Sequence, residues 1–194
     1  MKFRTTVLAL MLAAPTAFAA PITISKTETI TRSQQGFSFS LGGLPTAGKK
    51  AQFSVVLNGD YTTGVDSEFA TLVLESFGSL KLGGAWDNAK GVASNTVTGL
   101  TVDSYTVTNF GFSDDIQRSW VFNLTDSLFT KFAADKAFNF TVQNSSQVNN
   151  YKDAGADFVT ASLKFEPVPE PTSLALSGLG LALVALARRR RKSA

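Results

Sequence analysis

The chain has 194 residues, of which 18 are Lys or Arg and 15 are Asp or Glu, and it contains no His and no Cys. Without His and Cys it can have no Ser-His-Asp triad, Cys-His dyad, disulfide bond or ordinary His/Cys zinc site. Residues 20–168 hold 11 basic and 14 acidic residues, a net charge of −3. The net charge of +3 for the whole chain therefore comes from its two ends and gives no support to nucleic-acid binding.

Residues 1–19 predict a secretory signal peptide. Lys2 and Arg4 form a basic start, residues 5–14 are apolar, and Pro15 ends that run. Small residues then supply a cleavage site, and we place the cut after Ala19, because a later cut would leave Pro21 at the new N-terminus. The residues of this cleavage site are Ala17, Ala19 and Ala20. The segment implies export and processing by a signal peptidase.

Residues 20–166 predict one extracellular domain made mainly of β-strands. Apolar residues alternate with polar ones, as in strands with one buried and one wet face. The alternating segments are 37–41, 51–57, 120–124, 138–142 and 159–165. The Thr- and Ile-rich segment 22–31 is typical of an edge strand. The segment 69–74 is apolar on both faces, which is typical of a central strand.

One helix is predicted, over residues 125–136. Its apolar residues fall at helical spacing behind a capping Thr125 and Asp126, and they are Leu128, Phe129, Phe132 and Ala133. Many short strands with few helices indicate an all-β fold, an antiparallel β-sandwich or jelly roll. The abundant Phe side chains are then assigned to the core of that sandwich.

The loop after residue 57 contains four oxygen-bearing side chains close together: Asn58, Asp60, Asp66 and Glu68. Such ligands suit Ca²⁺, which takes six to eight oxygens. The spacing does not match an EF-hand, and the alternative, which we favour, is an ordinary turn with solvated acids. No cofactor is expected other than this candidate calcium ion.

Trp86 lies in a Gly-flanked loop beside Asp87 and Asn88. A Trp there can stack on a sugar ring while its polar neighbours bond the hydroxyl groups. The more common alternative is a Trp that anchors the loop on the edge of the sandwich. Trp120 is in phase with Phe122 and Leu124 and is therefore expected in the core.

The C-terminal segment 167–194 begins with three prolines that stop any regular element, Pro167, Pro169 and Pro171. Residues 172–187 are uncharged and predict a transmembrane helix of about 24 Å, which is shorter than the hydrocarbon core. A basic stop-transfer cluster follows at 188–192, consisting of Arg188, Arg189, Arg190, Arg191 and Lys192. Such a cluster stays in the cytoplasm, which leaves residues 20–168 outside.

The ordered set of Pro169-Glu170-Pro171, apolar helix and basic tail resembles a PEP-CTERM sorting signal. This resemblance covers residues 168–194. It implies a Gram-negative bacterium that makes exopolysaccharide and an exosortase that recognises the Pro-Glu-Pro motif and cuts nearby. The product would pass through an inner-membrane intermediate to the cell surface or extracellular matrix. The stretch from Asn58 to Phe69 also looks like a segment of surface β-sandwich domains that carry such signals.

Three functions remain open. The first is a structural or adhesive protein of the exopolysaccharide or biofilm matrix, with no enzymatic activity and with exosortase, signal peptidase and the membrane as partners. The second is a carbohydrate-binding module that uses Trp86 and calcium. The third, ranked lowest, is a small glycoside hydrolase, because Glu68 and Glu75 lie at opposite ends of a short strand, about 23 Å apart, too far for a catalytic pair.

Overall fold

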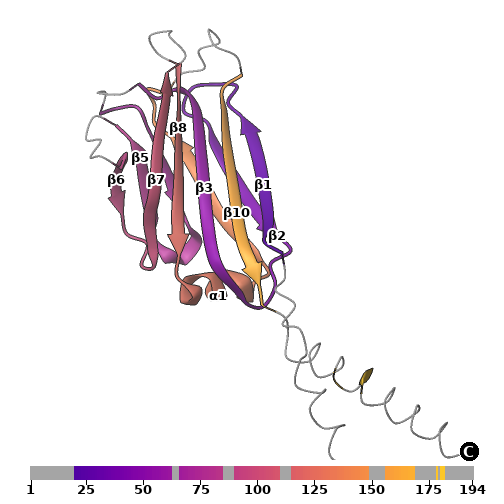
Figure 1. The fold of residues 1–194 in the computed structure, drawn as a ribbon. Coiled ribbons are helices and arrows are strands. Elements are labelled where there is room, and N and C mark those ends of the chain that lie inside the picture. Colours follow the sequence, from indigo (N-terminus) through magenta and orange to yellow (C-terminus); the bar gives the residue numbers. More distant parts are fainter. Residues whose placement is uncertain are drawn as a thin grey trace, which may run out of the picture.

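The computed structural model describes residues 20–62, 66–84, 90–109, 115–148 and 156–168, with 178, 180 and 181. These residues form two five-stranded sheets that pack face to face (Figure 1). Sheet A contains, in spatial order, β1 (Ile22–Thr29), β10 (Phe158–Pro167), β3 (Gly48–Asp60), β8 (Asp115–Leu124) and β7 (Leu100–Asn109). Sheet B contains β2 (Gly36–Gly42), β9 (Ala137–Asn144), β4 (Phe69–Val73), β5 (Ser79–Gly83) and β6 (Val92–Asn95). The predicted all-β sandwich is confirmed.

Every neighbouring pair of strands is antiparallel. The order β1-β10-β3-β8 faces the order β2-β9-β4-β5, which is the arrangement of an eight-stranded jelly roll. The two remaining strands, β6 and β7, follow one another in the chain and each adds one strand to the edge of a different sheet. They widen the sandwich on the side away from β1 and β2.

Phenylalanine rings fill the space between the sheets. Phe53 of β3 is fully buried and contacts three other rings, at centroid separations of 6.1 Å to Phe122, 4.8 Å to Phe138 and 5.2 Å to Phe140. Trp120 is also fully buried, as its alternation with Phe122 predicts. Inward-facing residues of both sheets thus build one core, and aromatic contacts between them add to the burial of apolar area.

Helix α1 (Asp126–Ala134) closes one end of the core. The Thr125 hydroxyl accepts a hydrogen bond from the backbone N–H of Leu128 at 3.3 Å, an N-cap that satisfies one of the free amides of the first turn. The predicted apolar face is the buried one, and it consists of Leu128, Phe129, Phe132 and Ala133. The helix prediction is therefore confirmed, with its end at Ala134 rather than Lys136. A short 3₁₀ helix, η2 (Glu75–Phe77), lies at the same end, where Phe77 packs on Phe132.

The sandwich has two unlike ends. The chain enters β1 and leaves β10 at the same end, because Ile22 pairs with Phe165. We call this end, with residues 43–50, α1 and η2, the exit pole (Figure 1). At the opposite end, the loop pole, Thr29 pairs with Phe158 and Asn109 with Ile116. The connections from β1 to β2, β3 to β4, β5 to β6, β7 to β8 and β9 to β10 all begin and end there.

One sequence prediction needs correction, and three strands were not predicted. The segment 69–74 does form β4 at the centre of sheet B, but it is not buried on both faces, because Val73 is 41 % exposed and Thr71 is half-buried. Its outer face is open to solvent, since no helix among the described residues covers sheet B. Strands β5, β6 and β7 were not among the predicted segments, because short or hydroxyl-rich strands show weak apolar alternation. The segment 22–31 is confirmed as an edge strand.

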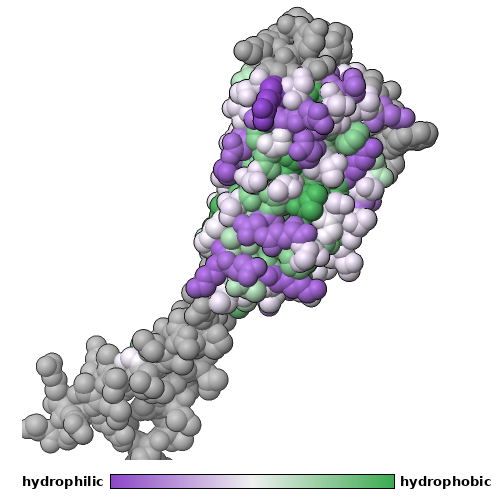
Figure 2. All heavy atoms as spheres, turned by 180° about the vertical axis from the view of Figure 1, so that it is seen from behind, coloured by the Kyte–Doolittle hydropathy of each residue, from purple (hydrophilic) through white to green (hydrophobic). Residues whose placement is uncertain are grey.

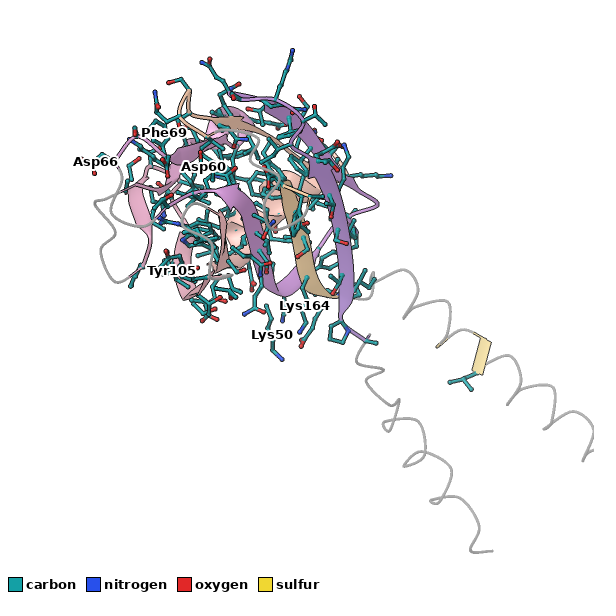
Figure 3. The ribbon with its side chains drawn as sticks, turned by 90° about the horizontal axis from the view of Figure 1, so that it is seen from above. Lys50, Asp60, Asp66, Phe69, Tyr105 and Lys164 are labelled. Atoms are coloured by element: carbon teal, nitrogen blue, oxygen red, sulfur yellow. The ribbon has the colours of Figure 1, made fainter. Side chains whose placement is uncertain are left out.

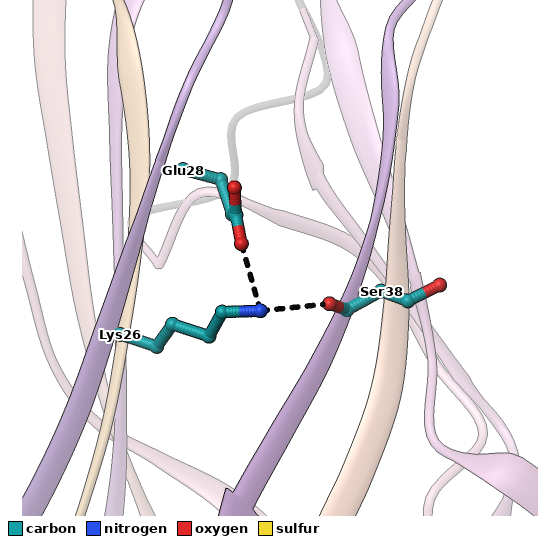
Figure 4. Close-up of polar contacts among 3 residues, drawn as sticks. All are labelled: Lys26, Glu28 and Ser38. Carbon is teal, nitrogen blue, oxygen red and sulfur yellow. Dashed lines mark hydrogen bonds and ion pairs between the residues drawn. The ribbon is translucent and has the colours of Figure 1, made fainter.

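The exposed edges of β1 and β2 lie beside one another. The Lys26 ammonium group of β1 donates to the backbone oxygen of Ser38 in β2 at 3.3 Å and pairs with Glu28 at 2.7 Å (Figure 4). A carbonyl on the open edge of β2 is thereby occupied by a charged group. Lysine at a sheet edge opposes pairing with a strand from another molecule.

Candidate functional site

The four candidate calcium ligands lie at the loop pole, but they differ in environment. Asn58 and Asp60, at the end of β3, are buried, and the Asn58 amide donates to the Ala156 carbonyl oxygen at 3.3 Å. Asp66 is exposed (Figure 3). Glu68 is half-buried and its Oε2 accepts the backbone N–H of Thr62 at 2.8 Å. Asn58 and Glu68 therefore already serve the local structure.

Within the described ranges, no group of three or more His, Cys, Asp or Glu side chains is placed to hold a metal ion. A Ca²⁺ ion takes six to eight oxygen ligands, so a site needs several carboxylate or carbonyl oxygens close together. Asp157, which is 2 % exposed, joins Asp60 near this pole and was not among the predicted ligands. Calcium binding stays a prediction.

Arg118 is the main feature of this pole that sequence reasoning missed. Its side chain is fully buried between the sheets. Nε donates to the Tyr61 carbonyl oxygen at 2.8 Å, Nη2 to the Thr62 carbonyl oxygen at 2.8 Å, and Nη1 to the Tyr105 hydroxyl at 3.3 Å. The guanidinium thus fixes the chain where it leaves β3. A signal existed, because Arg118 is in phase with Trp120 and Phe122 on the inward side of β8.

Tyr61 is the second buried polar side chain that organises the pole. It is fully buried, and its hydroxyl donates to Asn144 Oδ1 at 2.8 Å. Burial raises the pKa of the Tyr61 hydroxyl far above its usual value, and the negative charges of Asp157 and Asp60 raise it further. Tyr61 therefore stays neutral and acts as a hydrogen-bond donor that ties β3 to β9.

The candidate sugar-binding residues Trp86, Asp87 and Asn88 lie outside the described residues. The flanking residues Gly84 and Lys90 are described, and both lie at the loop pole. A methyl group added at Gly84 would stand 3.4 Å from the Asp66 carbonyl oxygen. Gly84 therefore lies beside Asp66, a proximity that sequence spacing alone did not indicate.

The outer surface of sheet A is covered by hydroxyl and amide side chains. Strand register aligns them in three rows, each crossing all five strands. We call this surface the hydroxyl face, and its rows are Thr27-Thr160-Val56-Ser119-Thr106, Ser25-Ser162-Ser54-Val121-Ser104 and Thr23-Lys164-Gln52-Asn123-Thr101. Lys164 is the one ionisable member of these rows.

Side chains of the hydroxyl face bond to one another across strands. The hydroxyls of Thr27 and Thr160 lie 2.8 Å apart, and Gln52 donates to Asn123 at 3.1 Å. Asn123 in turn donates at 2.9 Å to Asp103, which adds a carboxylate beside the row nearest the exit pole. With strands about 4.8 Å apart, the face spans about 19 Å across the sheet. It is a broad, nearly neutral field of donors and acceptors.

The outer surface of sheet B has a different character. Figure 2 shows hydrophobic groups in its middle with hydrophilic groups around them, in keeping with the 41 % exposure of Val73. A shallow depression of about 440 Å³ lies here, lined on its polar side by Lys26, Ser38, Ser40, Glu75, Asn139 and Thr141. A second depression, of about 380 Å³, lies at the exit pole beside Pro21, Lys50, Lys164 and Glu166. Neither contains a pair of facing carboxylates.

The last described bond of the body lies just before the predicted sorting motif. Pro167 pairs with Gly48, and the backbone N–H of Val168 donates to the Ala47 carbonyl oxygen at 3.2 Å. The motif Pro169-Glu170-Pro171, the basic cluster 188–192 and the signal peptide 1–19 lie outside the described residues. So does the predicted membrane helix 172–187, apart from Gly178, Gly180 and Leu181. Among the residues that the structure describes, no helix has the length and apolarity needed to cross a membrane.

Comparison with known proteins identifies the C-terminal segment. Residues 167–192 match the PEP-CTERM protein-sorting motif, which confirms the resemblance seen in the sequence. The chain is thus an exported protein targeted to an exosortase, with membrane-associated sorting to the cell surface. No curated protein sequence matches the chain. Among solved structures, the tripod (BppUct-A-L) from the baseplate of bacteriophage Tuc2009 matches at 8 % identity and a TM-score of 0.30, over 86 % of this chain and 70 % of that one.

Proposed function

We propose that this protein with a PEP-CTERM motif is a structural or adhesive component of an exopolysaccharide or biofilm matrix in a Gram-negative bacterium. The observation that carries the proposal is the hydroxyl face. Three rows of mostly Ser, Thr, Asn and Gln offer donors and acceptors at strand spacing, with Lys164 as the only charge within them. A neutral polysaccharide is covered by hydroxyl groups that can exchange hydrogen bonds with such a surface. The role is binding and structural, without catalysis.

The proposed route begins with signal peptidase cleavage after Ala19 and insertion of residues 172–187 into the inner membrane. An exosortase then cuts near Pro169-Glu170-Pro171 and releases the body from its basic tail. Intact mass of the protein from the culture medium and membranes of its host tests this route. We expect a chain that starts at Ala20 and ends near 169–171. A mature chain that still contains residues 174–194 would contradict the processing step.

Binding to the host exopolysaccharide tests the role of the body. Two charges placed on the hydroxyl face, Ser25→Glu with Ser104→Glu, should weaken co-sedimentation with the polysaccharide at least several-fold. These positions are on separate strands, so the new charges do not face one another. The matched control is Ser38→Glu with Ser94→Glu on the outer face of sheet B. Equal binding by both double variants would refute an adhesive hydroxyl face.

A second candidate, a carbohydrate-binding module that uses Trp86, Asp87 and Asn88 with calcium, is favoured by one observation. Gly84, two residues before Trp86, lies against the acidic loop that contains Asp66. A sugar and a cation bound at neighbouring loops would stabilise one another. Trp86→Ala and removal of calcium with EDTA should then each abolish glycan binding, whereas the hydroxyl-face variants should leave it unchanged.

A further inference from the structure

We propose that the exit pole of the body lies against the lipid surface before processing, with its lysines on anionic headgroups, and that the loop pole faces away from the membrane. This inference rests on the proposed function, because it requires residues 172–187 to span the bilayer. It adds an orientation, a contact surface and a lipid preference that the sorting motif itself does not specify.

The length of the connecting chain sets the distance to the membrane. The body is hydrogen-bonded up to Val168, whose N–H donates to Ala47 at 3.2 Å. The predicted membrane span begins at Thr172. Four residue steps reach at most about 14 Å when fully extended, and the headgroup region occupies roughly 5–8 Å of that distance. The point where the chain leaves β10 therefore stays at the membrane surface.

Strand topology decides which surface is held there. Lys49 and Gly48 pair with the last residues of β10, and Leu44 donates to the Lys136 carbonyl oxygen at the end of α1 at 3.2 Å. Residues 43–50 and α1 therefore surround the chain exit. The loop pole lies at the far end of β3 and β10. Since β10 has 10 residues, the two poles are roughly 33 Å apart.

The side chains at the exit pole suit an anionic surface. Five exposed lysines lie there, namely Lys49, Lys50, Lys131, Lys136 and Lys164. Lys50 and Lys164 project from β3 and β10 near the chain exit (Figure 3). Lys50 pairs with Glu166 at 3.0 Å. The acids of this pole are Glu75, Asp126, Asp135 and Glu166, together with Asp103 beside the row of Lys164, so the described residues of the pole are neutral overall, in a body whose net charge is −3.

An upright body is favoured over one that lies on the hydroxyl face. The rows of that face contain one charge, Lys164, and it belongs to the row nearest the exit pole. Lysine stems are long and place their ammonium groups among lipid phosphates. Polybasic surfaces next to a membrane span are attracted to anionic headgroups. The lysines therefore select the orientation within the range that the short chain permits.

The test uses the full chain in vesicles of phosphatidylcholine with or without phosphatidylglycerol. Because the chain has no Cys, single cysteines can carry a fluorophore without background labelling. The positions are Ala134→Cys on α1, Thr106→Cys on the hydroxyl face and Ser146→Cys at the loop pole, all exposed. Lipids with a nitroxide headgroup serve as quenchers. We expect quenching of the Ala134 label to exceed that of the Ser146 label several-fold, with the Thr106 label between them.

A second variant tests the lysines. Lys49, Lys131, Lys136 and Lys164, each changed to Gln, should reduce quenching at Ala134 in phosphatidylglycerol vesicles to the level seen in phosphatidylcholine alone. Equal quenching at the three positions, or no effect of the Gln changes, would overturn the proposal while leaving the anchor intact. A chain that does not float with the vesicles would overturn the membrane anchor together with the orientation.

Discussion

Replacing Arg118 by Met tests whether the buried guanidinium organises the loop pole. Met has a similar length but cannot donate to the carbonyl oxygens of Tyr61 and Thr62, each 2.8 Å from the guanidinium, or to the Tyr105 hydroxyl. A buried acceptor left without a donor costs about 1–3 kcal/mol. Thr62 and Tyr105 are half-buried, so water can replace part of their loss. The apolar side chain also avoids the cost of burying a charge. We expect a net loss of about 3 kcal/mol of unfolding free energy.

Urea titration followed by far-ultraviolet circular dichroism measures this loss, and a thermal scan should show a midpoint lower by roughly 6–12 °C. The matched control is Arg32→Met, which removes an exposed guanidinium at the same pole and should change stability by less than about 0.5 kcal/mol. If the two variants were equally stable, the hydrogen bonds of Arg118 would only offset its desolvation. Arg118 would then not be what fixes the chain where it leaves β3.

Three further predictions concern the fold. Gly48→Ala should destabilise the protein by about 1–3 kcal/mol in a urea titration, because the new methyl group would lie 2.6 Å from the Phe129 ring. Its control is Gly42→Ala, which has open space around it and should stabilise the protein by about 0.4–1 kcal/mol. Because the pKa of Tyr61 is raised in the folded state, its contribution to stability is complete below pH 10 and falls above that pH by about 1.4 kcal/mol per pH unit. Tyr61→Phe should remove this decrease when the unfolding free energy is measured between pH 9 and 11. Lys26→Thr should cost less than about 1 kcal/mol but increase self-association in sedimentation velocity, since it opens the β2 edge.

Much of the fold could be predicted because period-two alternation directly reports one buried face. Strands β2, β3, β8, β9 and β10 show that alternation clearly, and Thr125 marks the start of α1. Strand β7 did not stand out, because a register shift between Val102 and Ser104 interrupts its period-two alternation. The apolar character of 69–74 suggested burial on both faces. In the sheet, however, only the alternate residues Ala70 and Leu72 are buried.

The candidate site was less accessible to sequence reasoning, since contacts between distant segments decide it. Asn58, Asp60, Asp66 and Glu68 are close in the chain, yet two are buried and one bonds Thr62. The hydroxyl face depends on the register of five strands, which no local pattern reveals. The sorting motif was predictable because its recognition elements are contiguous in the chain.

The arrangement of β10 between β1 and β3 has a mechanical consequence. A pull between the proposed membrane tether, which follows Val168, and a partner at the loop pole would act along the strand axis. The hydrogen bonds of β10 to both neighbours run across that axis, so they would be loaded together in shear. A strand that joined the sheet by one edge at the point of attachment would peel open bond by bond. The proposed tether of this protein instead emerges from a strand that is paired along both of its edges, an arrangement suited to carrying tension.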